Sequence, residues 1–86
     1  MSNEFYFEIK RQFGVLSENQ KSGWKKEVNL VCWNGNPDRI DIREWDPEHE
    51  HMSKGLTFSL EEAEKLYTIL TQALLDTSWQ EKPADC

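Results

Sequence analysis

The sequence predicts an α+β domain in which a four-stranded twisted antiparallel sheet is followed by one C-terminal helix. Three observations predict this class. Apolar and polar residues alternate in three segments before residue 46, turn-forming residues separate those segments, and apolar residues recur at helical spacing after Ser59. The 86 residues suffice for one small domain, which we place at residues 1–78, with residues 79–86 as a flexible C-terminal tail.

Three strands follow from the alternation. The first covers FYFEI (residues 5–9), and its apolar parity persists past Gly14, a position suited to a β-bulge. The second covers residues 24–33, and the third covers RIDIREW (residues 39–45), after the turn formers NGNPD. A long acidic loop then leads to a short fourth strand at LTFS (residues 56–59).

One helix is predicted after these strands. Ser59 and Glu62 have the spacing of a capping box, in which each side chain accepts a hydrogen bond from the other residue's backbone N–H. The apolar stripe of this helix consists of Leu60, Ala63, Leu66, Tyr67, Leu70, Ala73 and Leu74. A helix of about 17 residues, roughly 25 Å long, covers only one face of a sheet, so we expect the other face to stay open.

The second and third strands divide their side chains between two faces. The face expected to lie inward carries Val28, Leu30, Cys32, Ile40 and Ile42. The face expected to stay open carries Lys25, Asn29, Val31, Trp33, Arg39, Arg43 and Trp45. Aromatic rings interleaved with cations on an open sheet are typical of a platform on which unpaired bases stack. Parity alone is equally compatible with a protein interface, and it also allows ordinary packing of the tryptophans.

The charge is unevenly distributed. The net charge is −6, which argues against tight binding to a polyanion. Residues 1–45 nevertheless hold seven of the ten Lys and Arg and only seven of the sixteen Asp and Glu, so the acidic excess lies in residues 46–86. Binding to nucleic acid is therefore expected to be modest and sensitive to salt.

Several classes of protein are not expected. The two cysteines are too few for a disulfide framework, and no apolar run approaches the roughly 18 residues of a membrane span, so a cytoplasmic protein is expected. His49 and His51 lie in the acidic loop without a cysteine or a third convergent ligand, so we expect no metal. A nucleophile with a paired base is also missing from the pattern, so neither an enzyme nor a cofactor is expected.

Two motifs carry a resemblance to a known family. The segment IDIREW-DPE, followed by KG-L-T and a capped helix, resembles the DNA-binding domain of the transcriptional coactivator positive cofactor four. Together with GWKKEVN upstream, the sequence is more similar to the compact bacterial YdbC-like branch of that family. The resemblance covers about residues 5–74. It implies a homodimer whose sheets form a groove for single-stranded DNA with little sequence preference.

The resemblance also implies which residues bind. Trp33 and Trp45 fall at positions of stacking aromatics, although the coactivators carry an aromatic pair where this sequence has only Trp45. Arg43 and Lys54 match the arginine and the lysine of the two motifs, which we expect to hold phosphates. The complete set of expected nucleic-acid-binding residues is Lys21, Lys25, Lys26, Trp33, Arg39, Arg43, Trp45 and Lys54.

We therefore expect a non-enzymatic homodimer, paired through the helix at residues 60–75, that binds single-stranded DNA or RNA and acts in transcription, replication or repair. The alternative from another class is a dimeric protein-interaction module that uses the open sheet face for a protein partner.

Overall fold

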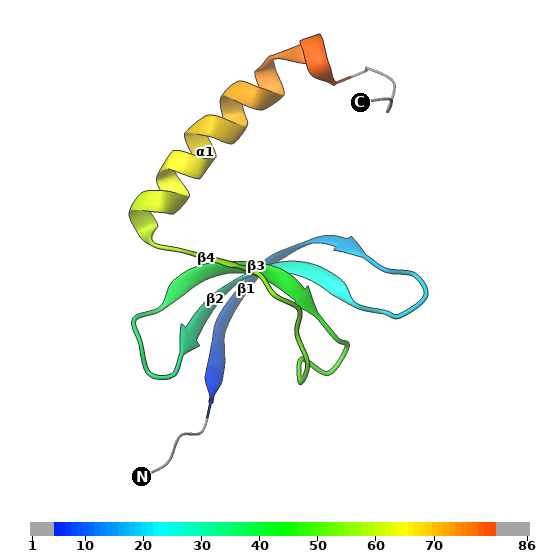
Figure 1. Cartoon of the computed structure of the whole chain (residues 1–86), viewed down its shortest axis with the longest axis vertical. Helices are drawn as coiled ribbons and strands as arrows, with labels where there is room; N and C mark the ends of the chain where they lie inside the picture. The colour runs from blue at the N-terminus through cyan, green and yellow to red at the C-terminus, as the bar shows by residue number, and fades with distance from the viewer. Residues whose placement is uncertain (1–4, 81–86) are drawn as a thin grey trace.

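The computed structural model describes residues 5–80 of the chain and confirms the four-stranded antiparallel sheet followed by one helix (Figure 1). The strands lie in the sheet in chain order, and each pairs antiparallel with the next. The elements are β1 (Phe7–Glu18), β2 (Lys25–Trp33), β3 (Arg39–Trp45), β4 (Leu56–Phe58), α1 (Leu60–Leu75) and a 3₁₀ turn (Thr77–Trp79).

β1 begins two residues later than the predicted first strand, continues past Gly14 as its apolar parity indicated, and is irregular. Its pairing with β2 shifts register three times, between Ile9 and Arg11, between Gln12 and Gly14, and between Val15 and Ser17. The second shift lies beside the predicted bulge position. Each bulge inserts an extra residue, bends its strand and increases the local twist. The sheet is accordingly arched, as Figure 1 shows.

A tight turn joins β2 to β3. Asn34 and Gly35 both have positive φ, at 52° and 78°, and the backbone N–H of Asn36 donates to the carbonyl of Trp33 at 2.8 Å. Asn-Gly with two positive φ values is the combination that two-residue hairpin loops prefer, because its twist matches that of the strands. The NGNPD segment therefore forms the predicted turn.

The two faces of β2 and β3 carry the residues predicted to share them, but their burial is the reverse of the prediction. The face predicted to be open is concave and contains the buried residues Glu27, Asn29, Val31, Asp41 and Trp45. On the convex face, Val28, Leu30, Cys32, Ile40 and Ile42 are only half-buried. We call these two surfaces the concave face and the convex face.

Two features of the tertiary structure cause this reversal. In Figure 1, α1 rises away from the convex side of the arch, while the loop between β3 and β4 and the start of β1 lie on the concave side. Pro47 of that loop also lies close to Gly23, beside the β1–β2 turn. A Cβ added to Gly23 would be 3.3 Å from Pro47 Cγ. The concave face is therefore covered by the chain's own loop, and the helix leaves much of the convex face uncovered.

The predicted capping box is present at the start of α1. Ser59 Oγ accepts from the Glu62 backbone N–H at 3.1 Å, and Glu62 Oε1 accepts from the Ser59 N–H at 2.9 Å. At the other end, Trp79 Nε1 donates to the Ala73 carbonyl and Gln80 Nε2 donates to the Leu74 carbonyl, both at 2.8 Å. Trp79 and Gln80, placed in the tail by the sequence analysis, thus contact the helix. The rest of the predicted tail, residues 81–86, lies outside the described residues.

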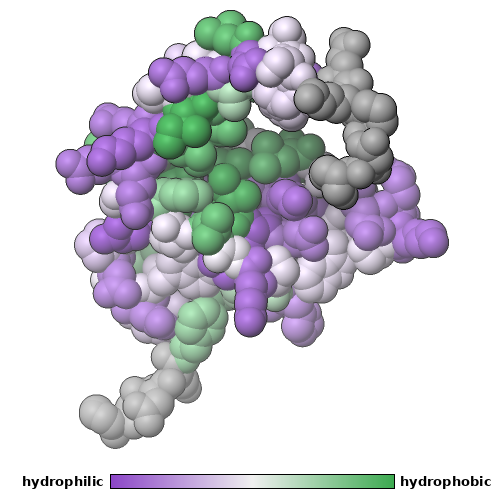
Figure 2. Space-filling view, turned by 45° about the horizontal axis from the view of Figure 1, so that its top comes forward, coloured by the Kyte–Doolittle hydropathy of each residue, from purple (hydrophilic) through white to green (hydrophobic). Residues whose placement is uncertain are grey.

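The apolar stripe of α1 is largely exposed and is not packed into a core. Most of its large side chains are exposed, including Leu60, Tyr67, Leu70 and Leu74. Figure 2 shows hydrophobic residues gathered in the region between the helix and the sheet, with hydrophilic residues on either side. Among residues 5–80, no helix is both long and apolar enough to cross a membrane.

Candidate functional site

A row of four adjacent rings, three of them stacked, forms the centre of the concave face. The ring centroids of Phe5 and Trp33 are 5.8 Å apart, those of Trp33 and Trp45 are 6.4 Å apart, and those of Trp45 and His49 are 5.6 Å apart. The two indoles are nearly parallel, with an angle of 9° between them. We call Phe5, Trp33, Trp45 and His49 the aromatic column. Phe7 packs against both tryptophans, at 5.6 and 5.2 Å.

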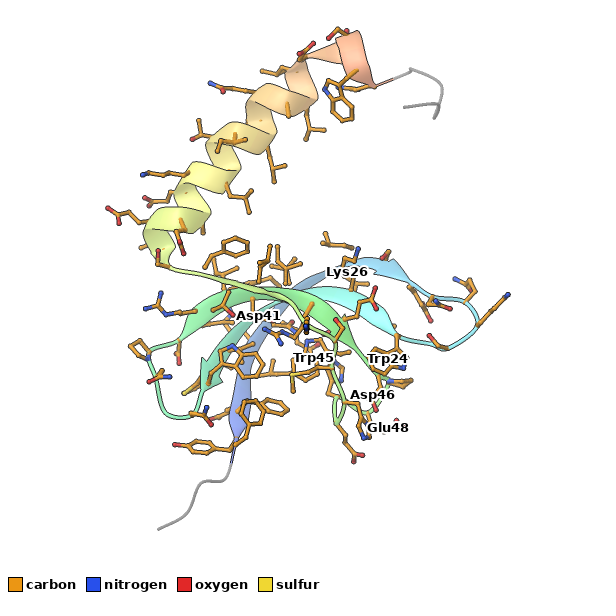
Figure 3. All side chains as sticks on the ribbon, in the orientation of Figure 1. Trp24, Lys26, Asp41, Trp45, Asp46 and Glu48 are labelled. Atoms are coloured by element: carbon orange, nitrogen blue, oxygen red, sulfur yellow. The ribbon has the colours of Figure 1, made fainter. Side chains whose placement is uncertain are left out.

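Exposure decreases from one end of the aromatic column to its third ring. Phe5 is 60% exposed, Trp33 is half-buried, and Trp45 is fully buried. The prediction that both indoles face solvent is therefore wrong for Trp45 and only partly right for Trp33. The cause is the β3–β4 loop, which lies over the Trp45 end of the column. Figure 3 shows Trp45 on the side of the sheet opposite α1, together with Asp46 and Glu48 of this loop.

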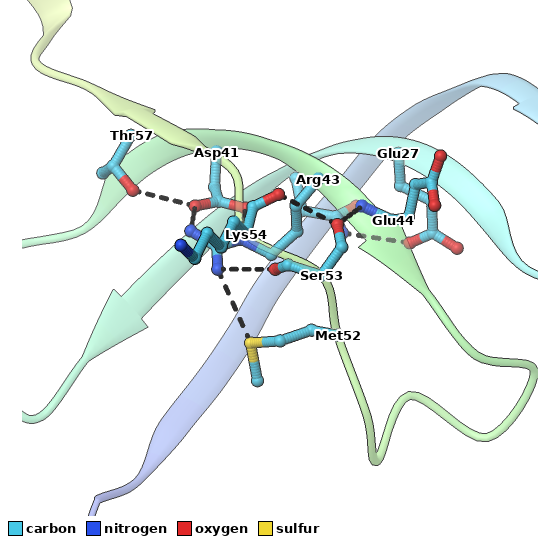
Figure 4. A network of polar contacts seen from close by, with 9 residues as sticks. Glu27, Asp41, Arg43, Glu44, Met52, Ser53, Lys54 and Thr57 are labelled. Atoms are coloured by element: carbon cyan, nitrogen blue, oxygen red, sulfur yellow. Dashed lines mark hydrogen bonds and ion pairs between the residues drawn. The ribbon is translucent and has the colours of Figure 1, made fainter.

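Arg43 is held by a network at the edge of the column (Figure 4). Its Nε and Nη2 donate to the two carboxylate oxygens of Asp41 at 2.7 and 2.8 Å, and its Nη1 donates to the Ser53 carbonyl at 3.2 Å. Asp41 is completely buried and also accepts from Thr57 Oγ1 at 2.8 Å. The Arg43 charge is thus largely balanced by Asp41, which differs from the predicted role as a free phosphate ligand.

The same guanidinium lies over the indole of Trp33, with Cζ 4.5 Å from the ring centroid. One further contact, from Nη1 to the Met52 sulfur at 3.6 Å, uses the second N–H of that nitrogen. Arginine carries five N–H donors, and one of the two on Nη2 remains available for another acceptor. Arg43 therefore orients Trp33 while it keeps limited capacity to bind a ligand.

A second buried pair attaches the β3–β4 loop to the sheet. His49 Nε2 lies 2.9 Å from both carboxylate oxygens of Glu27, and Asn29 Nδ2 donates to Glu27 Oε1 at 3.0 Å. His49 adopts a positive φ of 59°, which is uncommon for a residue with a side chain. The sequence analysis placed this histidine in a solvated loop, but it is half-buried against Trp45. Within the described residues, no group of three or more His, Cys, Asp and Glu could hold a metal ion.

Asp46 orders the beginning of this loop. Its Oδ1 accepts from the backbone N–H groups of Glu50 and His51 at 2.8 and 3.0 Å, and its Oδ2 lies 3.2 Å from His51 Nδ1. These hydrogen bonds favour the ionised carboxylate. The His51 backbone N–H has the largest effect, and together they lower the pKa of Asp46 below its ordinary value of 3.8.

The β3–β4 loop returns to the sheet through a glycine that must stay small. A Cβ on Gly55 would collide with the Arg43 Cβ and the Ile42 carbonyl oxygen, because the chain passes directly against β3 at this point. Lys54 immediately before it is exposed. Lys54, Lys26 and Ser53 line one side of a shallow pocket of about 430 Å³.

The predicted cations fall in different places. Lys25 and Arg39 belong to the concave face, Lys26 lies on the opposite side of β2, and Lys21 lies in the β1–β2 turn. All of them except half-buried Lys25 are exposed, and so is Lys54. Among residues 5–80, none of these five cations forms a salt bridge. The structure thus brings Trp33, Trp45, Arg43, Lys25 and Arg39 to one face. It places Lys21 in the β1–β2 turn, Lys54 in the β3–β4 loop and Lys26 on the opposite face.

The sequence reasoning missed three residues of this face. Phe5 was not among the expected site residues, yet it is the exposed end of the aromatic column. The sequence pattern placed Asp41 and Glu27 on this face but did not indicate a partner for either. Asp41 is the buried partner of Arg43, and Glu27 is the buried partner of His49. Within the described residues, three buried polar atoms on this face have no hydrogen-bond partner: Asn29 Oδ1, Trp33 Nε1 and Trp45 Nε1.

Comparison with known proteins gives two matches. A family model described as Transcriptional Coactivator p15 (PC4) matches residues 20–69, which span β2, β3, β4 and the first part of α1. An uncharacterized protein of Treponema pallidum (strain Nichols) is 36% identical over 76 residues, and the alignment covers 88% of each chain. The matched family region contains Trp33, Arg43, Trp45 and Lys54, whereas Phe5 precedes it.

Proposed function

Because this chain belongs to the transcriptional coactivator p15 (PC4) family, we propose that it binds single-stranded DNA without catalysing a reaction. The observation that supports this most directly is the aromatic column with the Arg43 guanidinium over Trp33. Unpaired bases stack on aromatic rings regardless of sequence, since every base has a π-face, so little sequence preference is expected.

The charges of the concave face support the same function despite the net charge of −6. Asp41 balances the charge of Arg43 on this face, and the Glu27 carboxylate is occupied by hydrogen bonds with His49 and Asn29. Five of the expected cations have no salt bridge within residues 5–80: Lys25 and Arg39 lie on this face, Lys21 in the β1–β2 turn, Lys54 in the β3–β4 loop and Lys26 on the opposite side of β2. We propose that these cations follow the phosphates while Trp33 contributes a ring edge and Trp45 supports it from within.

We further propose that two copies associate through α1 and the convex face. Large side chains of α1, such as Tyr67 and Leu70, are exposed, and Ile40 and Ile42 of β3 are only half-buried. Figure 2 shows hydrophobic residues gathered between the helix and the sheet. Exposed apolar patches of this kind mark interaction sites in folded proteins. A second copy offers the same apolar surface and is the simplest occupant, since two-fold dimers use one patch on both subunits.

The test is a titration of the protein with oligo(dT) at low salt, followed by tryptophan fluorescence. Binding is expected to quench the emission, and the affinity is expected to fall steeply as salt rises, because phosphate contacts release counterions. Lys54→Ala should weaken binding and lower the salt slope by about one. Lys65→Ala, a change of an exposed lysine on α1, serves as the control and should leave both unchanged.

The outcome also separates this function from its rival. If oligo(dT) and oligo(U) both leave the fluorescence unchanged and do not alter migration in a native gel, the single-stranded nucleic-acid function is wrong. The result would instead favour a protein-interaction module that uses the same surfaces for a protein partner. Binding to oligo(U) in preference to oligo(dT) would instead assign RNA as the ligand.

A further inference from the structure

Phe5 is the exposed end of the aromatic column, and we propose that its ring is the outer stacking site for an unpaired nucleobase. This inference rests on the proposed function and deepens it, because it names where a base first contacts the protein. The sequence-based expectation assigned that contact to Trp33 and Trp45. Trp45 is fully buried and Trp33 is half-buried, whereas Phe5 is 60% exposed.

The geometry of Phe5 suits a base. One side of its ring packs against the Trp33 indole at 5.8 Å with an angle of 30° between the planes. Trp33 in turn stacks on Trp45 at 9°. A base placed on the outer side of Phe5 therefore adds one more ring to a column whose inner members are already fixed. Stacking on a preformed surface costs little ordering of the protein.

The segment that carries Phe5 is anchored to the β2–β3 turn. The backbone N–H of Tyr6 donates to Asn34 Oδ1 at 2.9 Å, and the Asn34 N–H donates to the Tyr6 carbonyl at 2.8 Å. Asn34 can serve both bonds because it occupies the positive-φ position of the turn, at 52°. This reciprocal pair extends the β1–β2 pairing by one step beyond Phe7 and holds Phe5 beside Trp33.

The other exposed aromatic residues lack this setting. Among the described residues they are Tyr6, Phe13, Tyr67 and Trp79. Tyr67 and Trp79 belong to the helical part of the chain, on the other side of the sheet. Phe13 of β1 is 49% exposed, but its ring lies under the Arg11 guanidinium, 5.3 Å from Cζ to the centroid. Among the aromatic residues within 5–80, only Phe5 is both strongly exposed and stacked on a ring of the concave face.

A cation for the adjoining phosphate is also in place. Phe7 pairs with Trp33 across β1 and β2, and in the next row of this face Ile9, Val31 and Arg39 are register partners across three strands. Arg39 is exposed on the same face as Trp33. Arg39 is therefore one row from Trp33 and two rows from Phe5, so a strand whose base lies on Phe5 can reach an arginine on the same face with one of its phosphates.

The test measures the affinity of Phe5→Ala for oligo(dT) and for an abasic deoxyribose-phosphate oligomer of the same length. Loss of one base–aromatic stack corresponds to a drop in oligo(dT) affinity of about 5- to 150-fold. Affinity for the abasic oligomer should stay constant, because it has no base to stack. Phe5→Leu keeps an apolar side chain without a ring, and it should lose most of the same preference for oligo(dT).

Phe13→Ala is the matched control, since it removes an exposed phenylalanine of β1, the strand that follows Phe5. It should leave both affinities at the wild-type values. If wild-type protein binds oligo(dT) and Phe5→Ala binds it as tightly as Phe13→Ala does, the Phe5 site is wrong while the proposed function stands. If the wild type binds no single-stranded oligomer, both proposals are wrong.

Discussion

The guanidinium of Arg43 lies over the indole of Trp33, with 4.5 Å between Cζ and the ring centroid, while both of its terminal branches are bound by the protein itself. Asp41 fixes the guanidinium plane, because its two oxygens accept from Nε and Nη2. The cation–π contact is therefore prepared before any ligand arrives. An arginine that is already paired adds little net charge, so its main effect here is to orient a ring.

Asp41→Ala is predicted to destabilise the protein by about 3 kcal/mol or more. The Asp41 side chain is 0% exposed and that of Arg43 is 14% exposed, so the change leaves an uncompensated charge in a mostly buried site. Glu8→Ala is the control, because the Glu8–Lys10 pair spans 3.9 Å and its side chains are 69% and 39% exposed. Urea denaturation should show a change of about 0–1 kcal/mol for the control. Equal effects would mean that the Asp41–Arg43 pair is not a buried unit.

Gly55→Ala is predicted to cost about 1–3 kcal/mol, as overpacking does in a filled site. The added Cβ meets the Arg43 Cβ and the Ile42 carbonyl oxygen, and both belong to the central strand β3. Gly14→Ala is the matched control, since a Cβ there has no neighbour within 4 Å. Gly14→Ala should change the unfolding free energy by no more than about 0.5 kcal/mol. A neutral Gly55→Ala would show that β4 can move away from β3 freely.

His49→Gly is predicted to loosen the loop over Trp45 although it removes a strained backbone. Glycine adopts the positive φ of 59° without steric cost, so any loss of stability comes from the missing imidazole. The buried Glu27 carboxylate then lacks its partner at 2.9 Å, at a cost of about 1–3 kcal/mol. Hydrogen exchange of the Trp45 indole N–H, followed by NMR, should become faster.

The control for this change is His51→Ala, in which the lost imidazole is 75% exposed and lies 3.2 Å from Asp46. It should leave the Trp45 indole protected. Protection of Trp45 in both variants would mean that His49 does not hold the loop closed.

Acid is predicted to weaken the first part of the β3–β4 loop. The hydrogen bonds from His51 and Glu50 lower the pKa of Asp46 in the folded protein below the ordinary 3.8. A lowered pKa gives stability that is present above pH 3.8 and is lost as the pH falls through the lowered value. The protection of the Glu50 and His51 amides against hydrogen exchange, relative to the intrinsic rate at each pH, should therefore fall in that range. Asp46→Asn cannot titrate and should show no such loss of protection.

A second carboxylate provides the control for this pH effect. Hydrogen bonds from the side chain and backbone of Ser78 lower the pKa of Asp76 in the same direction, but Asp76 lies at the end of α1. Asp76→Asn should leave the acid response of the loop amides intact. If Asp76→Asn removes the acid response of the loop amides and Asp46→Asn does not, the response arises from the end of α1 and not from the loop.

Leu70→Glu is predicted to convert a homodimer into a monomer. Leu70 is exposed on the apolar stripe of α1, and a carboxylate there would have to be buried in the proposed interface. Gln72→Glu adds the same charge to an exposed position of the helix outside the stripe and should leave the mass unchanged. Light scattering after size-exclusion chromatography measures both. A monomeric wild type would contradict the proposed dimer outright.

The sequence by itself determined the local structure and the grouping of residues. The two-residue period of a strand assigns side chains to alternate faces, so Trp33, Arg43 and Trp45 had to share one. The β3 bounds at residues 39–45, the Asn-Gly turn and the Ser59–Glu62 capping box also follow from neighbours in the chain. Each of these depends on interactions within a few residues, which a local pattern expresses.

Only the tertiary structure decided which face is covered and which ring meets solvent. Three bulges in β1 arch the sheet, and the β3–β4 loop is attached through His49 to Glu27, which is 22 residues away in the sequence. The helix α1 rises away from the convex face and leaves much of it uncovered. Alternation cannot reveal this, because it distinguishes the two faces of a strand without specifying which face the rest of the chain will cover. For the same reason the alternation of residues 5–9 did not reveal that Phe5 lies at the exposed end of the aromatic column.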